Sequence, residues 1–226
     1  MNRTRVIALE GIDGSGKSVQ FERLRDALVA RGFSVATRAY PVYEGSFFGA
    51  QVGRYLTGSE GVRADSVDGK SMALWFALDR WEDLQQYRDG EADYLLINRY
   101  ILSNAVYQSV RDIDLGRPDL VDWVFELEYE HFHLPRVDVH LFYDVDLGAA
   151  EQNMQKKGFR GYVGEGKDVY EASDSLQARV RMKYLECAQR RDDIAVVPCM
   201  QQGMLLSMER VSQLTLDALK ARGMLD

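Results

Sequence analysis

The sequence has few of the residues that cross-link secreted proteins or bind metal ions. Its 226 residues include two cysteines, Cys187 and Cys199, which are too few for a disulfide framework. The three histidines, His131, His133 and His140, have no companions at metal-ligand spacing, and we interpret them as structural. This composition favours a reducing compartment, the cytoplasm.

Long hydrophobic runs and an excess of basic residues are also absent. No run reaches the length of a membrane span, and the polar first five residues do not resemble a signal peptide. A formal net charge of −7 argues against sequence-independent binding to nucleic acid, which needs a basic surface. We therefore expect a globular protein with neither a nucleic acid nor a membrane as its partner.

Glycine, in contrast, is concentrated in the segment ALEGIDGSGKSVQ, residues 8–20. Gly11, four further residues, Gly16, Lys17 and Ser18 have the spacing of a phosphate-binding P-loop. Glycines accept positive φ and let backbone N–H groups approach an anion, and the helix that follows directs its positive end at the same anion. The alternative is a plain glycine turn between a strand and a helix. The spacing favours a nucleotide-phosphate site formed by Gly11, Gly14, Ser15, Gly16, Lys17, Ser18 and Val19.

The rest of the chain alternates short hydrophobic segments with helical patterns. Strands are predicted at 6–10, 34–40, 94–98, 138–144 and 194–197. Helices are predicted at 17–31, 47–57, 68–89, 100–111, 118–132, 146–156, 170–191 and 204–222. This alternation predicts an α/β P-loop NTPase fold in three layers, a five-stranded parallel sheet with helices on both faces. We expect one domain over 1–226, with the P-loop at 11–18 and a short basic, glycine-rich lid at about 156–168.

A P-loop alone does not separate a GTPase, a motor ATPase and a small-molecule kinase. Lys17 is expected to pair with the transferred phosphate, and the Ser18 hydroxyl to bind Mg²⁺. The guanine-reading pattern Asn-Lys-x-Asp is missing, and no strand ends in a hydrophobic run followed by paired acids. Phosphoryl transfer to a small acceptor is the chemistry that remains.

Five segments make this more specific: EGIDGSGKS, YPVY (40–43), WFALDR (75–80), NRYILSNAVYQ (98–108) and DVYE (168–171). Their order and spacing resemble those of thymidylate kinases, from residue 5 to about 190. The resemblance implies transfer of the γ-phosphoryl group of ATP to thymidine monophosphate (dTMP), with Mg²⁺, by a homodimer. The alternatives are a kinase for another nucleotide or nucleoside, and a kinase-like regulatory module without turnover.

The resemblance also implies roles in base and sugar recognition. Phe76 would stack on thymine and Arg80, four residues later on the same helix face, would bind its O4 atom. Asn104 would meet the N3 edge of the base, and Tyr107 would block the space of a ribose 2′-hydroxyl. Core packing of Phe76 and Tyr107, and a solvated Asp79–Arg80 pair, are the alternatives.

The remaining implied roles concern the phosphates. Arg99 would clamp the acceptor phosphate bidentately, Tyr43 would contact it, and Tyr170 of DVYE would contact the substrate. Asp13 would contact the 3′-hydroxyl side of the acceptor and help Ser18 to organise the metal; a turn-forming aspartate is the alternative. The catalytic set is then Lys17, Asp13, Arg99 and Arg160.

Several positions depart from the family pattern, among them Val42 and Val137, and two of them bear on the mechanism. Asn98 stands where the family usually has aspartate, and Ser15 stands where some P-loops of the family have a basic residue. With Ser15 uncharged, the cation for the transition state is expected from the lid, from Arg160. The alternative is that Arg160 is a solvated loop charge.

Overall fold

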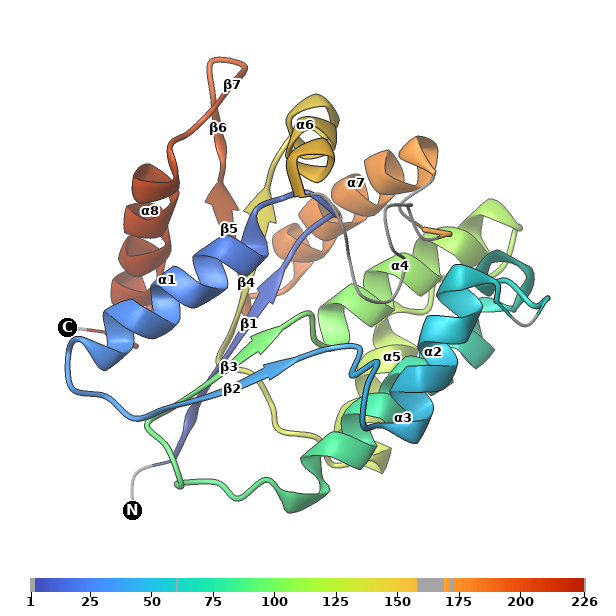
Figure 1. Cartoon of the computed structure of the whole chain (residues 1–226), viewed down its shortest axis with the longest axis horizontal. Coiled ribbons are helices and arrows are strands. Elements are labelled where there is room, and N and C mark those ends of the chain that lie inside the picture. Colours follow the sequence, from blue (N-terminus) through green and yellow to red (C-terminus); the bar gives the residue numbers. More distant parts are fainter. Residues whose placement is uncertain (1–2, 60, 158–168, 171–172, 226) are drawn as a thin grey trace.

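The computed structural model describes residues 3–59, 61–157, 169–170 and 173–225. Its centre is a sheet of five parallel strands in the order β2-β3-β1-β4-β5 (Figure 1). The strands are β1 (Arg5–Glu10), β2 (Val35–Ala39), β3 (Tyr94–Asn98), β4 (Val139–Asp144) and β5 (Ile194–Pro198). The three central strands β1, β3 and β4 are almost continuously buried, as a parallel sheet covered on both faces requires.

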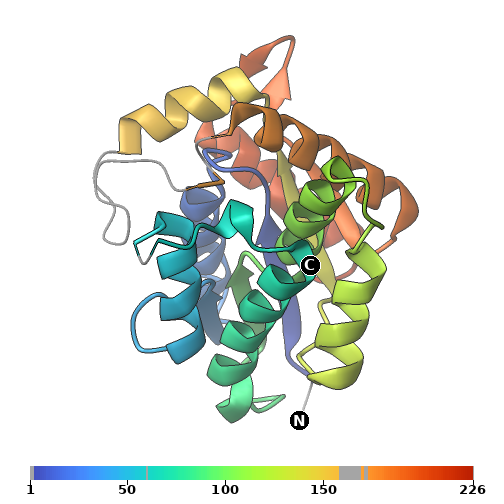
Figure 2. The same cartoon turned by 90° about the vertical axis from the view of Figure 1, so that its right-hand side faces the viewer.

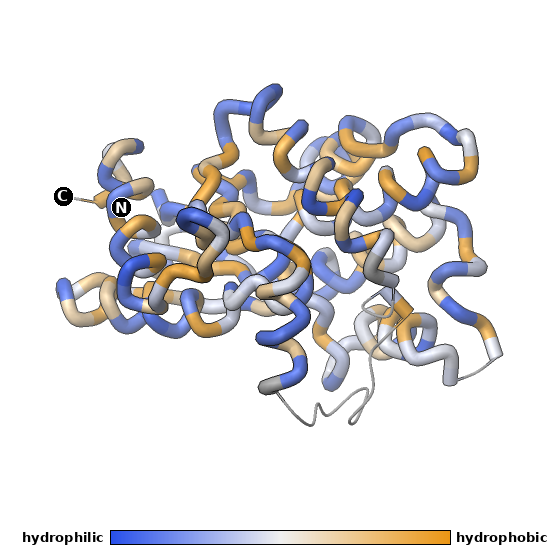
Figure 3. The backbone as a smooth tube through the Cα atoms, turned by 90° about the horizontal axis from the view of Figure 1, so that it is seen from above, coloured by the Kyte–Doolittle hydropathy of each residue, from blue (hydrophilic) through white to orange (hydrophobic). Residues whose placement is uncertain are grey.

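Helices cover both faces of this sheet. Helices α1 (Lys17–Val29) and α8 (Met208–Ala221) pack on one face, and α4 (Ile101–Asp114) and α7 (Asp174–Arg190) pack on the other (Figure 1). Helices α2 (Phe47–Thr57), α3 (Gly69–Asp83) and α5 (Val121–Glu126) extend the second layer beside α4 (Figure 2). Hydrophobic and hydrophilic residues are interspersed along the chain (Figure 3), and α8 buries Val211, Thr215 and Leu219 on one face.

The strand register brings several polar residues to one edge of the sheet. Leu9 of β1 is in register with Asn98 of β3, and Glu10 is in register with Phe142 of β4. The carboxyl ends of β1, β3 and β4 therefore meet where the P-loop leaves β1. Helix α6 (Leu147–Lys157) lies over the same edge (Figure 1). This is where open α/β sheets bind their ligands.

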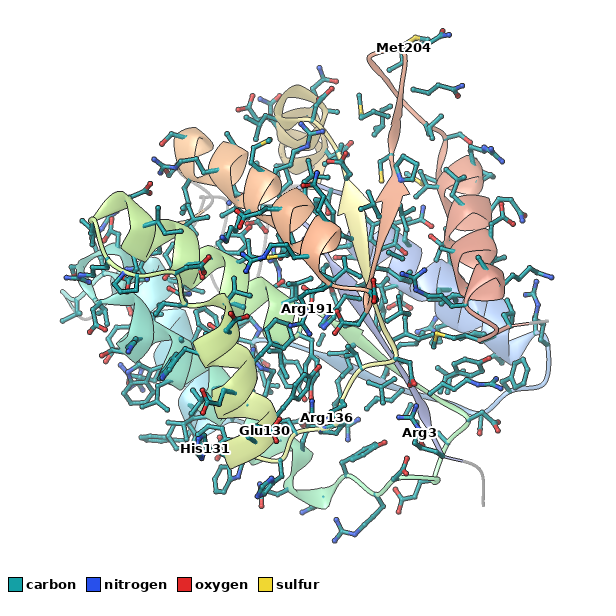
Figure 4. The ribbon with its side chains drawn as sticks, turned by 180° about the vertical axis from the view of Figure 1, so that it is seen from behind. Arg3, Glu130, His131, Arg136, Arg191 and Met204 are labelled. Carbon is teal, nitrogen blue, oxygen red and sulfur yellow. The ribbon has the colours of Figure 1, made fainter. Side chains whose placement is uncertain are left out.

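The predicted three-layer fold and its five strands are confirmed, and the differences lie at helix ends. The helix predicted to begin at residue 204 begins at Met208, because Met200–Gln201 and Met204–Leu205 form the hairpin β6–β7. Its turn residues Gln202 and Gly203 both have positive φ, which a tight hairpin needs. Met204 lies at the tip of this hairpin (Figure 4).

Two other predicted helices are shorter than expected. Helix α3 ends at Asp83 and continues as a single 3-10 turn, Leu84–Gln86. Helix α5 ends at Glu126 and continues as a π-helical turn, Leu127–His131. A 3-10 turn, Ala64–Ser66, precedes α3. Among the described residues no helix is long and hydrophobic enough to cross a membrane.

Candidate active site

The P-loop joins β1 to α1 through glycines in conformations that other residues rarely adopt. Gly14 and Gly16 have φ of +79° and +80°, and a Cβ on Gly14 would lie 2.1 Å from the carbonyl oxygen of Ala150. Helix α1 begins directly at Lys17, so the positive end of its dipole lies at the loop. The Lys17 Nζ donates to the Ile12 carbonyl at 2.9 Å, which holds the ammonium group over the loop. This is a cradle for an anion.

Asp13 and Arg99 form an ion pair beside this cradle. Arg99 Nη2 donates to Asp13 Oδ1, and the side chains of Arg99 and Asp13 are 22% and 17% exposed, so the pair is mostly buried. Burial alone would raise the pKa of Asp13, but Arg99 and Lys17 outweigh it and hold that pKa below its ordinary value. Asp13 is therefore ionised at neutral pH.

Arg99 lies at an unusual backbone position between β3 and α4. Its φ of +63° is in the left-handed region, which disfavours residues with a side chain. The surrounding hydrogen bonds hold it there: Arg99 N donates to the Leu9 carbonyl at 3.0 Å, and Tyr100 N donates to the buried Glu10 carboxylate at 3.0 Å. The first turn of α4 is thus fixed against β1, and the Arg99 guanidinium is directed toward Asp13.

A pocket opens beside the Asp13–Arg99 pair. Its empty space is about 550 Å³, a figure that includes the open solvent at its mouth. Asp13, Arg99 and the other residues predicted to bind substrate all line it; those others are Tyr43, Phe76, Arg80, Asn104, Tyr107 and Tyr170. Residues far apart in the sequence therefore converge on one cavity next to the P-loop.

The inner wall of the pocket contains a buried ion pair between α3 and the segment after α5. Arg80 is 2% exposed and Glu128 is not exposed at all, and Arg80 Nε donates to Glu128 Oε2 at 2.6 Å. Asp79 is also buried and accepts from the Ser46 hydroxyl at 2.9 Å. A solvated Asp79–Arg80 pair, one alternative from the sequence, is therefore not formed. Burial would lower the pKa of Arg80, but Glu128 outweighs it and raises that pKa.

Two buried amides that line the same pocket each have one polar atom without a hydrogen-bond partner among the described residues. Asn104 Nδ2 donates to the Ala73 carbonyl at 3.0 Å and to Glu128 at 2.9 Å, so its Oδ1 is left without a partner among the described residues. Gln108 Oε1 accepts from Arg111, and its Nε2 likewise finds no partner in the described part of the chain. The partners fix both amide orientations, because a carbonyl or carboxylate only accepts and a guanidinium only donates. The pocket lining therefore contains one buried acceptor and one buried donor that the described residues leave unsatisfied.

Some aromatic residues at this site line the pocket, and others pack behind it. Trp75 packs against Tyr55, with ring centroids 5.8 Å apart, and leaves the neighbouring Phe76 half-buried at the pocket. Tyr107 stacks on Tyr170 at 5.9 Å, and its hydroxyl lies 3.2 Å from Asp13 Oδ2. Burial and the nearby Asp13 raise the pKa of Tyr107 well above its usual range, so this hydroxyl keeps its proton.

The residues present fit a Mg²⁺ ion that is bound together with nucleotide phosphates. Ser18 lies in the first turn of α1, and Asn98 Oδ1, at the end of β3, is a buried oxygen without a partner among the residues described. Within the described chain no group of three His, Cys, Asp or Glu side chains could hold a metal by itself. A Mg²⁺ ion on phosphates keeps several waters and needs only one or two protein oxygens.

Some functional residues were missed from the sequence, and others lie beyond the described residues. Gln108, Arg111 and Gln177 contact the predicted site residues. Gln108 ends the segment NRYILSNAVYQ but was given no role there, and the motif segments include neither Arg111 nor Gln177. Asp144, at the carboxyl end of β4, is paired with Arg181 at 2.6 Å and does not line the pocket. Arg160 and residues 158–168 of the predicted lid lie outside the described residues.

Comparisons with known proteins agree with this geometry. The family model "Thymidylate kinase" matches residues 9–207. The thymidylate kinase of Mycobacterium tuberculosis H37Rv is 34% identical over 186 residues, which cover 81% of this chain and 85% of that protein. A probable thymidylate kinase of Methanosphaera stadtmanae is 27% identical, covering 84% of this chain and 87% of that protein. The solved thymidylate kinase of Candida albicans superposes with a TM-score of 0.73 at 23% identity, covering 98% of this chain and 93% of that one.

Proposed function

This chain belongs to the thymidylate kinase family and transfers the γ-phosphoryl group of ATP to dTMP, giving dTDP and ADP, and we propose how its residues perform that transfer. The whole chain acts as one kinase domain. The observation that supports this most directly is that two residues lining the pocket beside the P-loop have buried amide atoms without partners among the described residues, Asn104 Oδ1 and Gln108 Nε2.

Those two atoms are complementary to the edge of thymine. The base presents an N3–H donor between two carbonyl oxygens. Asn104 Oδ1 accepts from N3–H, and the Arg80 guanidinium, held by Glu128, donates to O4. Gln108 Nε2 supplies a further donor on the same wall, and Phe76 stacks on the ring. Cytosine presents an acceptor at N3, which would face the Asn104 oxygen and leave both lone pairs unpaired.

The phosphates lie at the other end of the pocket. Arg99 and Tyr43 bind the acceptor phosphate, and Lys17 neutralises the charge on the transferred group. Arg160 supplies a further cation from the lid. Ser18 and Asp13, with Asn98 nearby, hold Mg²⁺, which when bound neutralises the phosphates of ATP. Catalysis is then positioning and charge neutralisation, without a covalent intermediate.

The sugar lies between the base and the phosphate. Asp13 contacts its 3′-hydroxyl side, because its carboxylate is ionised and faces the cavity. The ring of Tyr107 occupies the space of a ribose 2′-hydroxyl, and Tyr170 supports that ring by stacking on it.

We also propose a cytoplasmic homodimer. Leu74, Leu78 and Trp81 share one face of α3, and Leu74 and Trp81 are 40% and 37% exposed. An exposed hydrophobic stripe of this kind is typical of a protein interface. Trp81→Glu should then shift the protein to a monomer in sedimentation equilibrium, and an unchanged mass would contradict this interface. Cys187 and Cys199 are free and buried, which agrees with a reducing compartment.

A substrate panel tests the function. ADP release should be followed with dTMP, dUMP, dCMP and dGMP, with ATP and Mg²⁺ in excess. We expect dTMP and dUMP to be phosphorylated and the kcat/KM for dCMP to be at least about 100-fold lower. Asn104→Leu should lose most of that discrimination. Comparable kcat/KM values for dTMP and dCMP in the wild type would contradict the assignment of the base edge.

A further inference from the structure

Gln177 of α7 lies at the centre of the hydrogen bonds behind the acceptor pocket. It is 3% exposed and does not line the pocket itself. Its Oε1 accepts from Asp13 N at 3.2 Å and from the Tyr107 hydroxyl at 3.0 Å. Its Nε2 donates to Asp13 Oδ2 at 3.1 Å and to the Tyr170 carbonyl at 3.1 Å. One amide thus connects the P-loop, α4 and the segment before α7.

The orientation of this amide is fixed by its partners. Asp13 N can only donate and the Tyr170 carbonyl can only accept, so Oε1 and Nε2 cannot be exchanged. The Tyr107 hydroxyl must then be a donor, because neither Gln177 Oε1 nor the Asp13 carboxylate offers a hydrogen. Gln177 Oε1 is therefore one of two acceptors for the Tyr107 proton, and Gln177 Nε2 binds the Asp13 oxygen that Arg99 does not.

We infer that Gln177 is a positioning residue of the acceptor site: it aligns the Asp13 carboxylate and the Tyr107 hydroxyl for the sugar and phosphate of the nucleotide. The inference rests on the proposed function. Without the amide, Asp13 Oδ2 loses its N–H donor and the carboxylate can turn away from Arg99. The Tyr170 carbonyl loses its hydrogen bond to α7, which loosens the Tyr170 backbone beside the ring that stacks on Tyr107.

Gln177→Glu is the most selective test, because it keeps the shape of the side chain and both acceptor contacts. It replaces the donor by an oxygen that faces Asp13 Oδ2 and the Tyr170 carbonyl. By isothermal calorimetry at pH 8, we expect dTMP to bind at least about 10-fold more weakly than to the wild type, the cost typical of losing a hydrogen bond to a charged group. Gln189→Glu, the same change at an exposed position of α7, should leave the affinity unchanged.

A second background tests whether Gln177 acts through Asp13. In the variant Asp13→Asn, the new amide can donate to a carboxylate at position 177. This restores the hydrogen bond between residues 13 and 177, with residue 13 as the donor in place of residue 177. Relative to Asp13→Asn, the double variant Asp13→Asn/Gln177→Glu should lose less than about twofold in dTMP affinity. An equal loss in both backgrounds would refute the coupling.

Separate controls distinguish a folding defect from a loss of dTMP binding. If Gln177→Glu does not fold, judged by its thermal transition, Gln177→Met removes the same hydrogen bonds without adding charge and should weaken dTMP binding at least about fivefold. Wild-type affinity in Gln177→Met would overturn the inference. Failure of the wild type itself to bind dTMP would instead refute the proposed function, which is a different result.

Discussion

Glu128→Gln should be among the most destabilising single changes in this protein. Glu128 and Arg80 are both buried, and the Arg80 Nε–Glu128 Oε2 distance is 2.6 Å. Glutamine keeps the size and one acceptor oxygen, but it removes the charged carboxylate that binds the buried Arg80 guanidinium. Removing one partner of a buried ion pair costs about 3–5 kcal/mol. The remaining neutral hydrogen bond places the expectation near the lower end, at about 3 kcal/mol.

Urea unfolding followed by circular dichroism measures this free energy of unfolding directly. For a chain of this size, about 3 kcal/mol also lowers the melting temperature by roughly 6–12 °C. Glu130→Gln is the matched control, because Glu130 lies two residues away and pairs with Arg136 on the surface (Figure 4), where both side chains are 59% exposed. That change should cost less than about 0.5 kcal/mol.

The double variant Arg80→Met/Glu128→Leu separates the effect of the buried charges on stability from the role of Arg80 in binding dTMP. Hydrophobic replacement of a whole buried pair is often neutral, so the double variant should recover most of the stability lost in Glu128→Gln. It should still fail to bind dTMP, because the donor to O4 has gone. The reasoning is refuted if Glu128→Gln is no less stable than Glu130→Gln, or if the double variant is as unstable as the single one.

Three further predictions concern turnover. Lys17→Ala should lower kcat by at least about 100-fold with an unchanged circular dichroism spectrum, because it removes charge stabilisation of the transition state; near-normal turnover would exclude the P-loop from the mechanism. Tyr107→Ala should allow ribonucleoside monophosphates to bind and should lower the free energy of unfolding by about 3 kcal/mol. Unchanged selectivity for deoxyribose would mean that Tyr107 acts only in packing. Arg160→Ala should lower kcat more than it raises the KM for dTMP, and the reverse pattern would assign Arg160 to uniform binding.

The fold could be predicted because its signals are local. Strands β1, β3 and β4 are short hydrophobic runs, and the helices between them follow a helical period, so the parallel sheet follows from the alternation. The hairpin at Met204 could not be predicted. Its turn uses Gln202 and Gly203, and glutamine is not a residue whose presence indicates positive φ.

The sequence predicted candidate site residues only where they belong to a recognisable motif. The motif segments include Asp13, Arg99, Asn104 and Tyr107, and all of these line one pocket. Gln177 is a polar residue in a long helix, and its role depends on contacts with residues 164 and 70 positions away. Such contacts exist only in the folded chain. The pairing of Arg80 with Glu128, in place of a solvated Asp79–Arg80 pair, is another long-range contact that forms only in the folded chain.

Asn98 offers the clearest test of how this chain organises its metal ion. It ends β3, and its buried Oδ1 has no hydrogen-bond partner among the residues that the structure describes. Aspartate here would add one negative charge near Mg²⁺ and the phosphates. At an effective dielectric of about 20 and a separation of about 6 Å, one unit charge against another is worth roughly 3 kcal/mol.

The same charge also repels the acceptor phosphate, so the net effect on turnover should be smaller than that figure. We expect the wild type to be active, and Asn98→Asp to need less Mg²⁺ for half-maximal rate, with the KM for dTMP flat or slightly raised. A Mg²⁺ titration of both proteins at saturating ATP and dTMP decides this. Asn98→Leu, which offers no oxygen, serves as the control and should need more Mg²⁺ than the wild type. Identical curves for all three proteins would mean that residue 98 does not act on the metal and that Ser18 with Asp13 organises it alone.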